Sequence, residues 1–234
     1  MIAIPCRRTV NRRKERAPRS GPVWSVGVHT CAVDAALGIV LPLAAGLVLA
    51  AVAGLRAFLP LAVLGLAGRL GLIELGPGFS WLSSAPALRT FWSACLVELL
   101  GDKIPVVDHA LDAVGTVLRP IAGALALAAV TTRPGPLWTT VLAIVVGGGA
   151  AGLVHLGKAH ARLGSSLLSL GVANPLLSVG EDVLSFGLAT LAVLVPVLAL
   201  ILLALLVFGA YRLVRRLART AIFPAGKPAP RAAG

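Results

Sequence analysis

Long runs of apolar residues without a single charge are the feature that most limits what this chain can fold into. Two runs of 21 residues, 35–55 and 134–154, and one of 28 residues, 183–210, contain no charged side chain. A helix needs roughly 20 apolar residues to cross the hydrocarbon core of a bilayer. The chain is 58% hydrophobic and 13% charged, about half the charged share of a soluble domain. The sequence therefore predicts an all-α integral membrane protein, a polytopic bundle of transmembrane helices.

Helix-breaking residues divide this apolar body into about six predicted membrane segments, some of them broken or re-entrant. The stretch GLRAFLP, Gly54–Pro60, predicts a broken or kinked helix because proline removes a helical hydrogen bond. Pro105 suits the first turn of a new helix, and the glycines of Gly147–Gly152 predict close helix packing. The last long helix is predicted to follow Asp182 and end near Tyr211. Four full spans with two re-entrant hairpins fit the same pattern.

The net charge of +12 lies at the two ends of the chain, because the basic and acidic residues between the ends cancel. This distribution is typical of membrane proteins whose basic segments stay in the cytoplasm. We therefore expect a disordered basic cytoplasmic arm over 1–32, a transmembrane bundle over 33–210 and a basic cytoplasmic tail over 211–234. The expected location is the inner membrane of a bacterial cell, with anionic lipid as a partner of both ends. Nucleic acid is not an expected partner, since no stacking groups are interleaved with the cations.

A short internal echo raises the question of a repeated unit. Ala53-Gly54-Leu55 recurs as Ala151-Gly152-Leu153, and each copy precedes a basic segment and then an acidic pair. An inverted repeat over 33–130 and 131–210 would bring broken helices together near the middle of the membrane. Three matched residues in a chain rich in Gly, Ala and Leu also arise by chance, so both interpretations stay open.

Acidic residues are concentrated in the stretch VELLGDKIPVVDHALD, residues 97–112. Asp108, Asp112 and Arg119 would share one face of a helix that begins at Pro105, and Glu98 and Asp102 lie four residues apart beside Lys103. A charge at the centre of a bilayer costs at least about 2.5–3.5 kcal/mol, so such a row is expected to face a partner or a wet cavity. The alternative is that the stretch lies at the membrane interface.

Basic residues form a complementary stripe further along the chain. His155, Lys158 and Arg162 follow the glycine segment at spacings of three and four, so they share one helix face. One interpretation pairs this face with the acidic row across the glycine-packed interface, for example Lys158 with Asp112. The alternative is a basic flank whose side chains reach the membrane surface.

A third polar element is GVANPLLSVGED, residues 171–182. Asn174 before Pro175 is a good helix start, and a half-helix beginning inside the membrane would point its N–H groups at a bound anion. Glu181 and Asp182 would then stand at the start of the final span. An ordinary interfacial turn explains the same residues.

These stretches in series, GLRAFLP, VELLGDKIPVVDHALDAVGTVLRPIAGAL, AGLVHLGKAHAR and NPLLSVGED, resemble a family of bacterial integral-membrane proteins catalogued as a domain of unknown function, family number 4126. The resemblance covers about residues 48–196 and leaves both basic ends outside. It implies a polytopic helical membrane fold, and it carries no activity, substrate or catalytic residue that could be transferred.

Three classes of function are compatible with this pattern. A transporter, channel or lipid translocator is favoured, with an unknown small solute or ion as its ligand. Its expected site consists of Glu98, Asp102, Lys103, Asp108, Asp112, Arg119, Arg56, His155, Lys158, Asn174, Glu181 and Asp182. A scaffold or accessory subunit comes next, in which the charges only fix the helix register. An enzyme acting on lipid phosphates is the least favoured, because no catalytic or metal motif is present.

No cofactor and no metal are expected. The three widely spaced cysteines predict no disulfide framework. A homo-oligomer is compatible with the sequence.

Overall fold

The computed structural model describes residues 24–131, 135–169 and 174–222, and every regular element in these ranges is helical. The predicted all-α fold is therefore confirmed. In chain order the elements are α1 Trp24–Leu55, α2 Leu59–Arg69, the 3-10 helix η1 Pro77–Ser83, α3 Ala85–Gly101, α4 Pro105–Val130, α5 Pro136–Leu142, the π-helix η2 Ala143–Gly148, α6 Gly149–Ser169, α7 Asn174–Leu194 and α8 Pro196–Ile222. Most of the predicted basic arm and the end of the basic tail lie outside the described residues.

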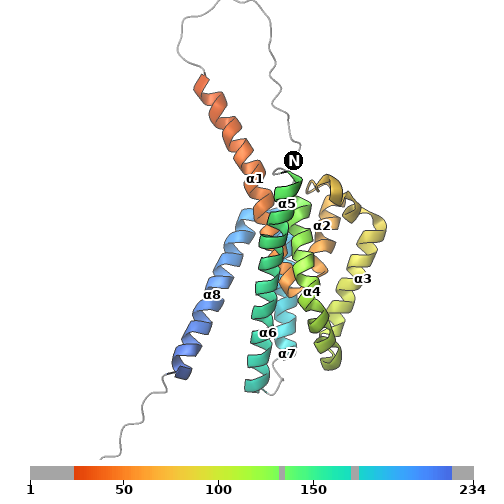
Figure 1. The fold of residues 1–234 in the computed structure, drawn as a ribbon, viewed down its shortest axis with the longest axis vertical. Helices are drawn as coiled ribbons and strands as arrows, with labels where there is room; N and C mark the ends of the chain where they lie inside the picture. The colour runs from red at the N-terminus through yellow and green to blue at the C-terminus, as the bar shows by residue number, and fades with distance from the viewer. Residues whose placement is uncertain (1–23, 132–134, 170–173, 223–234) are drawn as a thin grey trace, which may run out of the picture.

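Five helical segments are long and apolar enough to cross a membrane, within the ranges that the structure describes. They are Ala36–Leu55 in α1, Ala110–Val130 in α4, Pro136–Gly164 across α5, η2 and α6, Leu176–Leu194 in α7 and Pro196–Arg216 in α8. A shorter apolar helix, α2, and α3 form a hairpin beside them (Figure 1). The protein is thus a multi-pass membrane protein.

Helix α1 is the central element of the bundle. Its lower half lies behind α4 and α6 in Figure 1, and it also contacts α7 and α8. Half of the residues in its apolar span and in that of α4 are buried inside the protein, against 6% in the span of α8. Helix α8 packs only through residues such as Ala199 and Leu203, and then diverges from the bundle (Figure 1). Most of the surface of α8 is therefore exposed.

Small residues let the backbones of α1, α4 and α6 approach closely. A Cβ atom added to Gly54 would lie 2.4 Å from the carbonyl oxygen of Ala151, and one added to Gly123 would lie 2.7 Å from that of Gly147. These contacts confirm close packing at the glycine segment. The two copies of the sequence echo touch each other here, although nothing in the structure tests whether they belong to a repeat.

Two helix breaks interrupt the apolar body. The first falls at residues 56–58 inside GLRAFLP, as predicted, and Pro60 lies in the first turn of α2. The second separates α7 from α8 at Val195, so the prediction of one last long helix from Asp182 to Tyr211 is wrong. Pro196 causes this break, because proline lacks an N–H and disfavours helical geometry in the residue before it. Helix α8 also continues past Tyr211 to Ile222.

The two ends of the described chain lie at opposite ends of the bundle. Helix α1 starts at the top of Figure 1, and α8 ends at the bottom. An odd number of full crossings would place them on opposite sides of a bilayer, whereas the shared cytoplasmic side expected from the sequence requires an even number. The orientation of both ends therefore stays a prediction.

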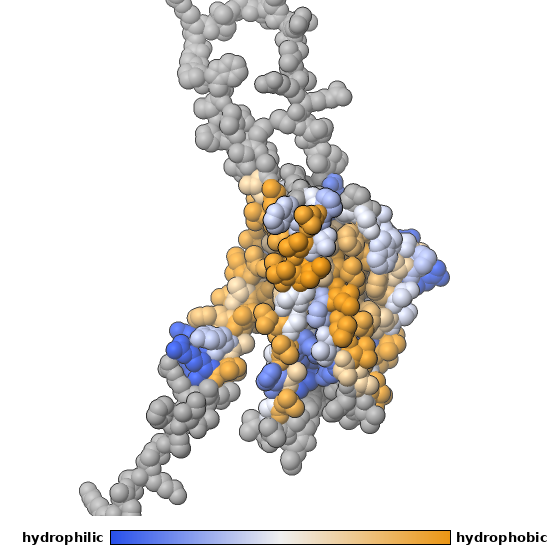
Figure 2. Space-filling model, in the orientation of Figure 1, coloured by the Kyte–Doolittle hydropathy of each residue, from blue (hydrophilic) through white to orange (hydrophobic). Residues whose placement is uncertain are grey.

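Hydrophobic side chains cover most of the length of the bundle, and polar ones gather toward its lower end and at the upper right, where α3 begins (Figure 2). The exposed arginines 212, 215 and 216 lie in the C-terminal part of α8, which runs to the lower end. Such a surface, with an apolar body and polar groups toward its ends, suits a protein surrounded by lipid chains with its ends at the headgroups.

Replacing Gly54 by alanine should weaken the packing of α1 against α6, because the new methyl group would meet backbone that cannot easily move. We expect a loss of about 1–3 kcal/mol in the free energy of unfolding, seen as a lower melting temperature in detergent. The matched control is Gly157→Ala in α6, where a Cβ atom meets nothing within 4 Å. Equal melting temperatures of the two variants would contradict the packing described here.

Candidate functional site

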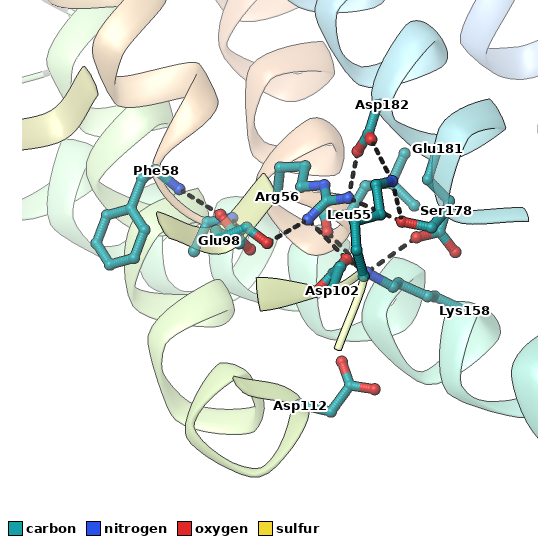
Figure 3. Close-up of polar contacts among 12 residues, drawn as sticks. Leu55, Arg56, Phe58, Glu98, Asp102, Asp112, Lys158, Ser178, Glu181 and Asp182 are labelled. Atoms are coloured by element: carbon teal, nitrogen blue, oxygen red, sulfur yellow. Dashed lines mark hydrogen bonds and ion pairs between the residues drawn. The ribbon is translucent and has the colours of Figure 1, made fainter. Parts of the chain in front are cut away.

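Charged side chains from six parts of the chain meet at the break between α1 and α2 (Figure 3). We call this group the charge cluster. It contains five acidic and five basic residues: Glu98, Asp102, Asp112, Glu181 and Asp182, with Arg56, Lys103, Arg119, Lys158 and Arg162. The cluster as a whole is formally neutral. Opposite charges within it compensate one another where water is scarce.

The two ends of the broken helix meet charges of the sign that suits them. The Lys158 ammonium donates to the carbonyl oxygen of Leu55, the last residue of α1, at 3.2 Å. The Glu98 carboxylate accepts from the backbone N–H groups of Ala57 at 3.1 Å and Phe58 at 3.4 Å, where α2 begins. A helix carries partial negative charge at its carboxyl end and partial positive charge at its amino end. The break is therefore stabilised by side chains from α6 and α3.

Arg56, which lies inside the break, links α3 to α7. Its guanidinium pairs with the Asp102 carboxylate at 2.6 Å and also with Asp182. It donates to the backbone carbonyl of Glu98 at 3.1 Å and to the Ser178 hydroxyl at 3.4 Å. Lys103 reaches Asp182 at 3.0 Å from the solvent side. Arg56 is 1% exposed, so its charge is neutralised entirely by these neighbours.

Asp102 has the highest concentration of cations around it. One of its oxygens, Oδ2, lies 2.6 Å from Arg56, 3.1 Å from Arg162 and 3.7 Å from Lys158. Its other oxygen, Oδ1, is buried and has no hydrogen-bond partner in the structure. Glu181 contacts Lys158 at 3.0 Å and Arg162 at 3.2 Å, so the same two cations are shared between two acids.

A second group of contacts connects α4 with α6. Arg119 pairs with Asp112 at 3.1 Å and contacts the Nδ1 atom of His155, whose other ring nitrogen lies 3.3 Å from the Thr116 hydroxyl. Asp112 also reaches Arg162 at 3.4 Å, which joins this group to the rest of the charge cluster. The contacts run in an unbroken series from α7 to α4.

The charge cluster begins at one end of the bundle and extends inward. Arg56 directly follows the span that ends at Leu55, whereas Arg119 lies nine residues into the span that starts at Ala110. Nine helical residues cover about 13 Å. Exposure differs from residue to residue within the cluster: the side chain of Lys103 is 37% exposed, whereas those of Asp102 and Arg119 are buried. The cluster therefore extends from one end of the bundle to about the middle of the α4 span.

Glu98 and the adjacent Asp102, which lie outside the five spans, have opposite electrostatic environments. Burial raises the pKa of Glu98 above its ordinary value, against the opposing effect of the Ala57 N–H group and of nearby arginines. Burial also raises the pKa of Asp102, but Lys158, Arg56 and Arg162 together outweigh it and hold that pKa below its ordinary value. Glu98 is therefore the easier of the two to protonate.

Most of the residues predicted from the sequence do meet. The acidic row and the basic stripe face each other, and Arg56, Lys103, Glu181 and Asp182 join them, although nothing in the structure tests whether they bind a ligand. The specific pairing of Asp112 with Lys158 differs from the contacts: Asp112 pairs with Arg119 and Arg162, while Lys158 pairs with Asp102 and Glu181.

Asp108, Asn174 and the predicted half-helix at Asn174 are not part of the charge cluster as described. The side chains of Asp108 and Asn174 lie outside the described residues. The short half-helix expected at Asn174 is instead the start of α7, which continues through Glu181 and Asp182 to Leu194. Ser178 was missed, although it lies four residues before Asp182 and so on the same helix face.

The charge cluster is not arranged as a metal centre. Among residues 24–131, 135–169 and 174–222, no three His, Cys, Asp or Glu side chains are grouped so that they could hold a metal ion. The acids are separated by basic side chains instead, each close enough for an ion pair. The chemistry that this arrangement offers is exchange of ionic partners and transfer of protons.

The family described as "domain of unknown function (DUF4126)" matches residues 43–216, from the middle of α1 to the basic end of α8. The chain belongs to this family. No curated protein and no solved structure matches the chain. The match confirms the resemblance seen in the sequence and extends it to residues 43–216, which hold the charge cluster, most of the first span and all of the other four.

Removing one partner from the charge cluster should be costly, because it leaves an uncompensated buried charge. We expect Lys158→Met to lower the free energy of unfolding by about 3–5 kcal/mol, measured by thermal or denaturant unfolding in detergent. The matched control is Arg89→Met on the exposed face of α3, where the guanidinium contacts only a backbone carbonyl. That change should stay within about 0.5 kcal/mol, and equal effects of the two substitutions would contradict the account.

Proposed function

We propose that the protein transports an ion or a small charged solute across the membrane, and that the charge cluster is its binding site. The observation that carries the proposal is the broken helix α1–α2, whose free backbone ends contact Lys158 and Glu98. Broken helices at membrane depth are tolerated where they are buried in protein or line a cavity, and transporters use their ends to bind substrate and coupling ions. The same groups could exchange their present partners for those of a solute.

The distribution of exposure supports a route into the site. Lys103, Asp112 and Asp182 are partly exposed, whereas Asp102, Arg119 and Lys158 behind them are buried. A charged solute arriving from the lower end of the bundle would first meet the exposed pairs and then the buried ones. In this arrangement the internal ion pairs close the site, so the solute enters by replacing them.

The sharing of Asp102 among three cations supports a site that can rearrange. Because Arg56, Arg162 and Lys158 all approach one carboxylate oxygen, each can move toward another acid without losing every partner. Arg162 already contacts three acids, namely Asp102, Asp112 and Glu181. Alternative pairings of similar energy are what a two-state transport cycle needs.

A scaffold or accessory role is the second candidate. It is favoured by the internal balance of the charge cluster, in which each acid already has a basic partner within 4 Å. In that role the ion pairs would fix the register of the helices and nothing would pass between them.

Flux measurements in liposomes test the transport proposal. Purified protein is reconstituted with an entrapped pH-sensitive dye, with radioactive sodium or chloride, or with a fluorescent phospholipid as a probe of lipid scrambling. We expect the wild type to move an ionic probe faster than protein-free liposomes, and Asp102→Asn to lower that rate by about tenfold or more, since a buried charge pair carries several kcal/mol. Glu74→Gln, on an exposed site away from the cluster, should keep the wild-type rate.

Three outcomes separate the candidates. Movement of the lipid probe alone would replace the ion by a lipid as the substrate, and no movement of any probe would contradict transport. The double variant Lys158→Gln/Glu181→Gln removes a pair that lies 3.0 Å apart and should fold better than Lys158→Gln alone. A transporter with this double change would fold and lose flux, whereas a scaffold would keep its function.

A further inference from the structure

Glu98 differs from the other acids of the charge cluster in what holds it. Its carboxylate forms an ion pair with Arg119 at 3.9 Å, whereas the carboxylate of each of the other four acids has a cation within 3.1 Å. Its oxygens are held instead by the N–H groups of Ala57 and Phe58 at the start of α2. Glu98 is 4% exposed. It is therefore a buried acid that depends on backbone donors more than on ion pairs.

We propose that Glu98 is the proton-binding site of the charge cluster, and that a proton bound there loosens the first turn of α2. The role of this proton in coupling rests on the proposed transport function, whereas proton binding and the loosening of α2 can be measured without any transport. The proposal assigns the coupling ion of the site as H⁺.

The chemistry follows from the number of acceptors. An ionised carboxylate offers both oxygens to the two N–H groups, but a bound proton turns one oxygen into an O–H donor. Only one oxygen then remains a good acceptor, and the attraction between the negative charge and the amino end of α2 is lost. The longer contact, from Phe58 N–H at 3.4 Å, is expected to break first.

The neighbours of Glu98 can tolerate its neutralisation. Arg119 on α4 keeps Asp112 and His155 as partners when Glu98 loses its charge. Arg56 at the break contacts the backbone carbonyl of Glu98, which a proton on the side chain leaves unchanged.

The other charged and titratable neighbours of Glu98 also favour proton binding at Glu98 over proton binding at Asp102. Asp182 on α7 and Asp102, which directly follows α3, both pair with Arg56. Cys95 lies three residues before Glu98 in α3. A proton on Asp102 would instead leave three cations facing a neutral group, which is far more costly. The proton is therefore expected at Glu98 and not at Asp102.

Infrared spectroscopy of the reconstituted wild-type protein tests proton binding directly. As the pH falls, the C=O stretch of a protonated carboxyl group should appear in the difference spectrum. Glu98→Gln should lack this component, and Glu74→Gln, which alters an exposed acid, should keep it. An unchanged band in Glu98→Gln would overturn the assignment. A band in liposomes that show no flux would leave the proton site standing and contradict the transport function alone.

Hydrogen–deuterium exchange tests the effect on α2. After correction for the intrinsic pH dependence of exchange, protection of the segment around Ala57 and Phe58 should fall by about tenfold as Glu98 takes up its proton. Glu98→Gln should show low protection at every pH, and Glu74→Gln should follow the wild type. The wild-type titration stands by itself if Glu98→Gln does not fold. Protection that is independent of pH in the wild type would contradict the coupling of Glu98 to α2.

Discussion

The compensation of buried charge is the constraint on which the rest of this structure depends. Ten charged side chains lie inside a bundle of largely apolar helices, from one end to about the middle of α4, and an isolated charge there would cost several kcal/mol. The bundle avoids this cost by bringing together segments that are far apart in sequence. Arg56, for example, contacts a residue 126 positions away. The ion pairs therefore hold the helices in one arrangement as well as neutralising one another.

The helix break at residues 56–58 and the charge cluster require each other. The break frees the carbonyl of Leu55 and the N–H groups of Ala57 and Phe58, and these groups have no water to bond to in a bilayer. Lys158 and Glu98 supply the missing partners. Close packing through Gly54 brings α6 near enough for Lys158 to reach Leu55. A glycine, a broken helix and a buried lysine thus form one structural unit.

The sequence predicted the components of this unit far better than their partners. Spacings of three and four residues placed His155, Lys158 and Arg162 on one face, because helical geometry is local. The partner of Lys158 could not be read in the same way, because it depends on how α6 is rotated and shifted against α4 and α7. Asp112 proved to face Arg119 and Arg162 instead. The break at Pro196 could have been predicted from its proline, but the apolar run around it concealed it.

Length, composition and periodicity by themselves determined that this chain is a multi-pass helical membrane protein with a charge-balanced body and a helix break near Arg56. They do so because apolar length, helix faces and proline effects are properties of short segments. Only the tertiary structure decided that the charges form one connected cluster near one end of the bundle, which acid meets which base, and that Glu98 binds the start of α2. Those outcomes depend on contacts between segments tens of residues apart, which no local pattern encodes.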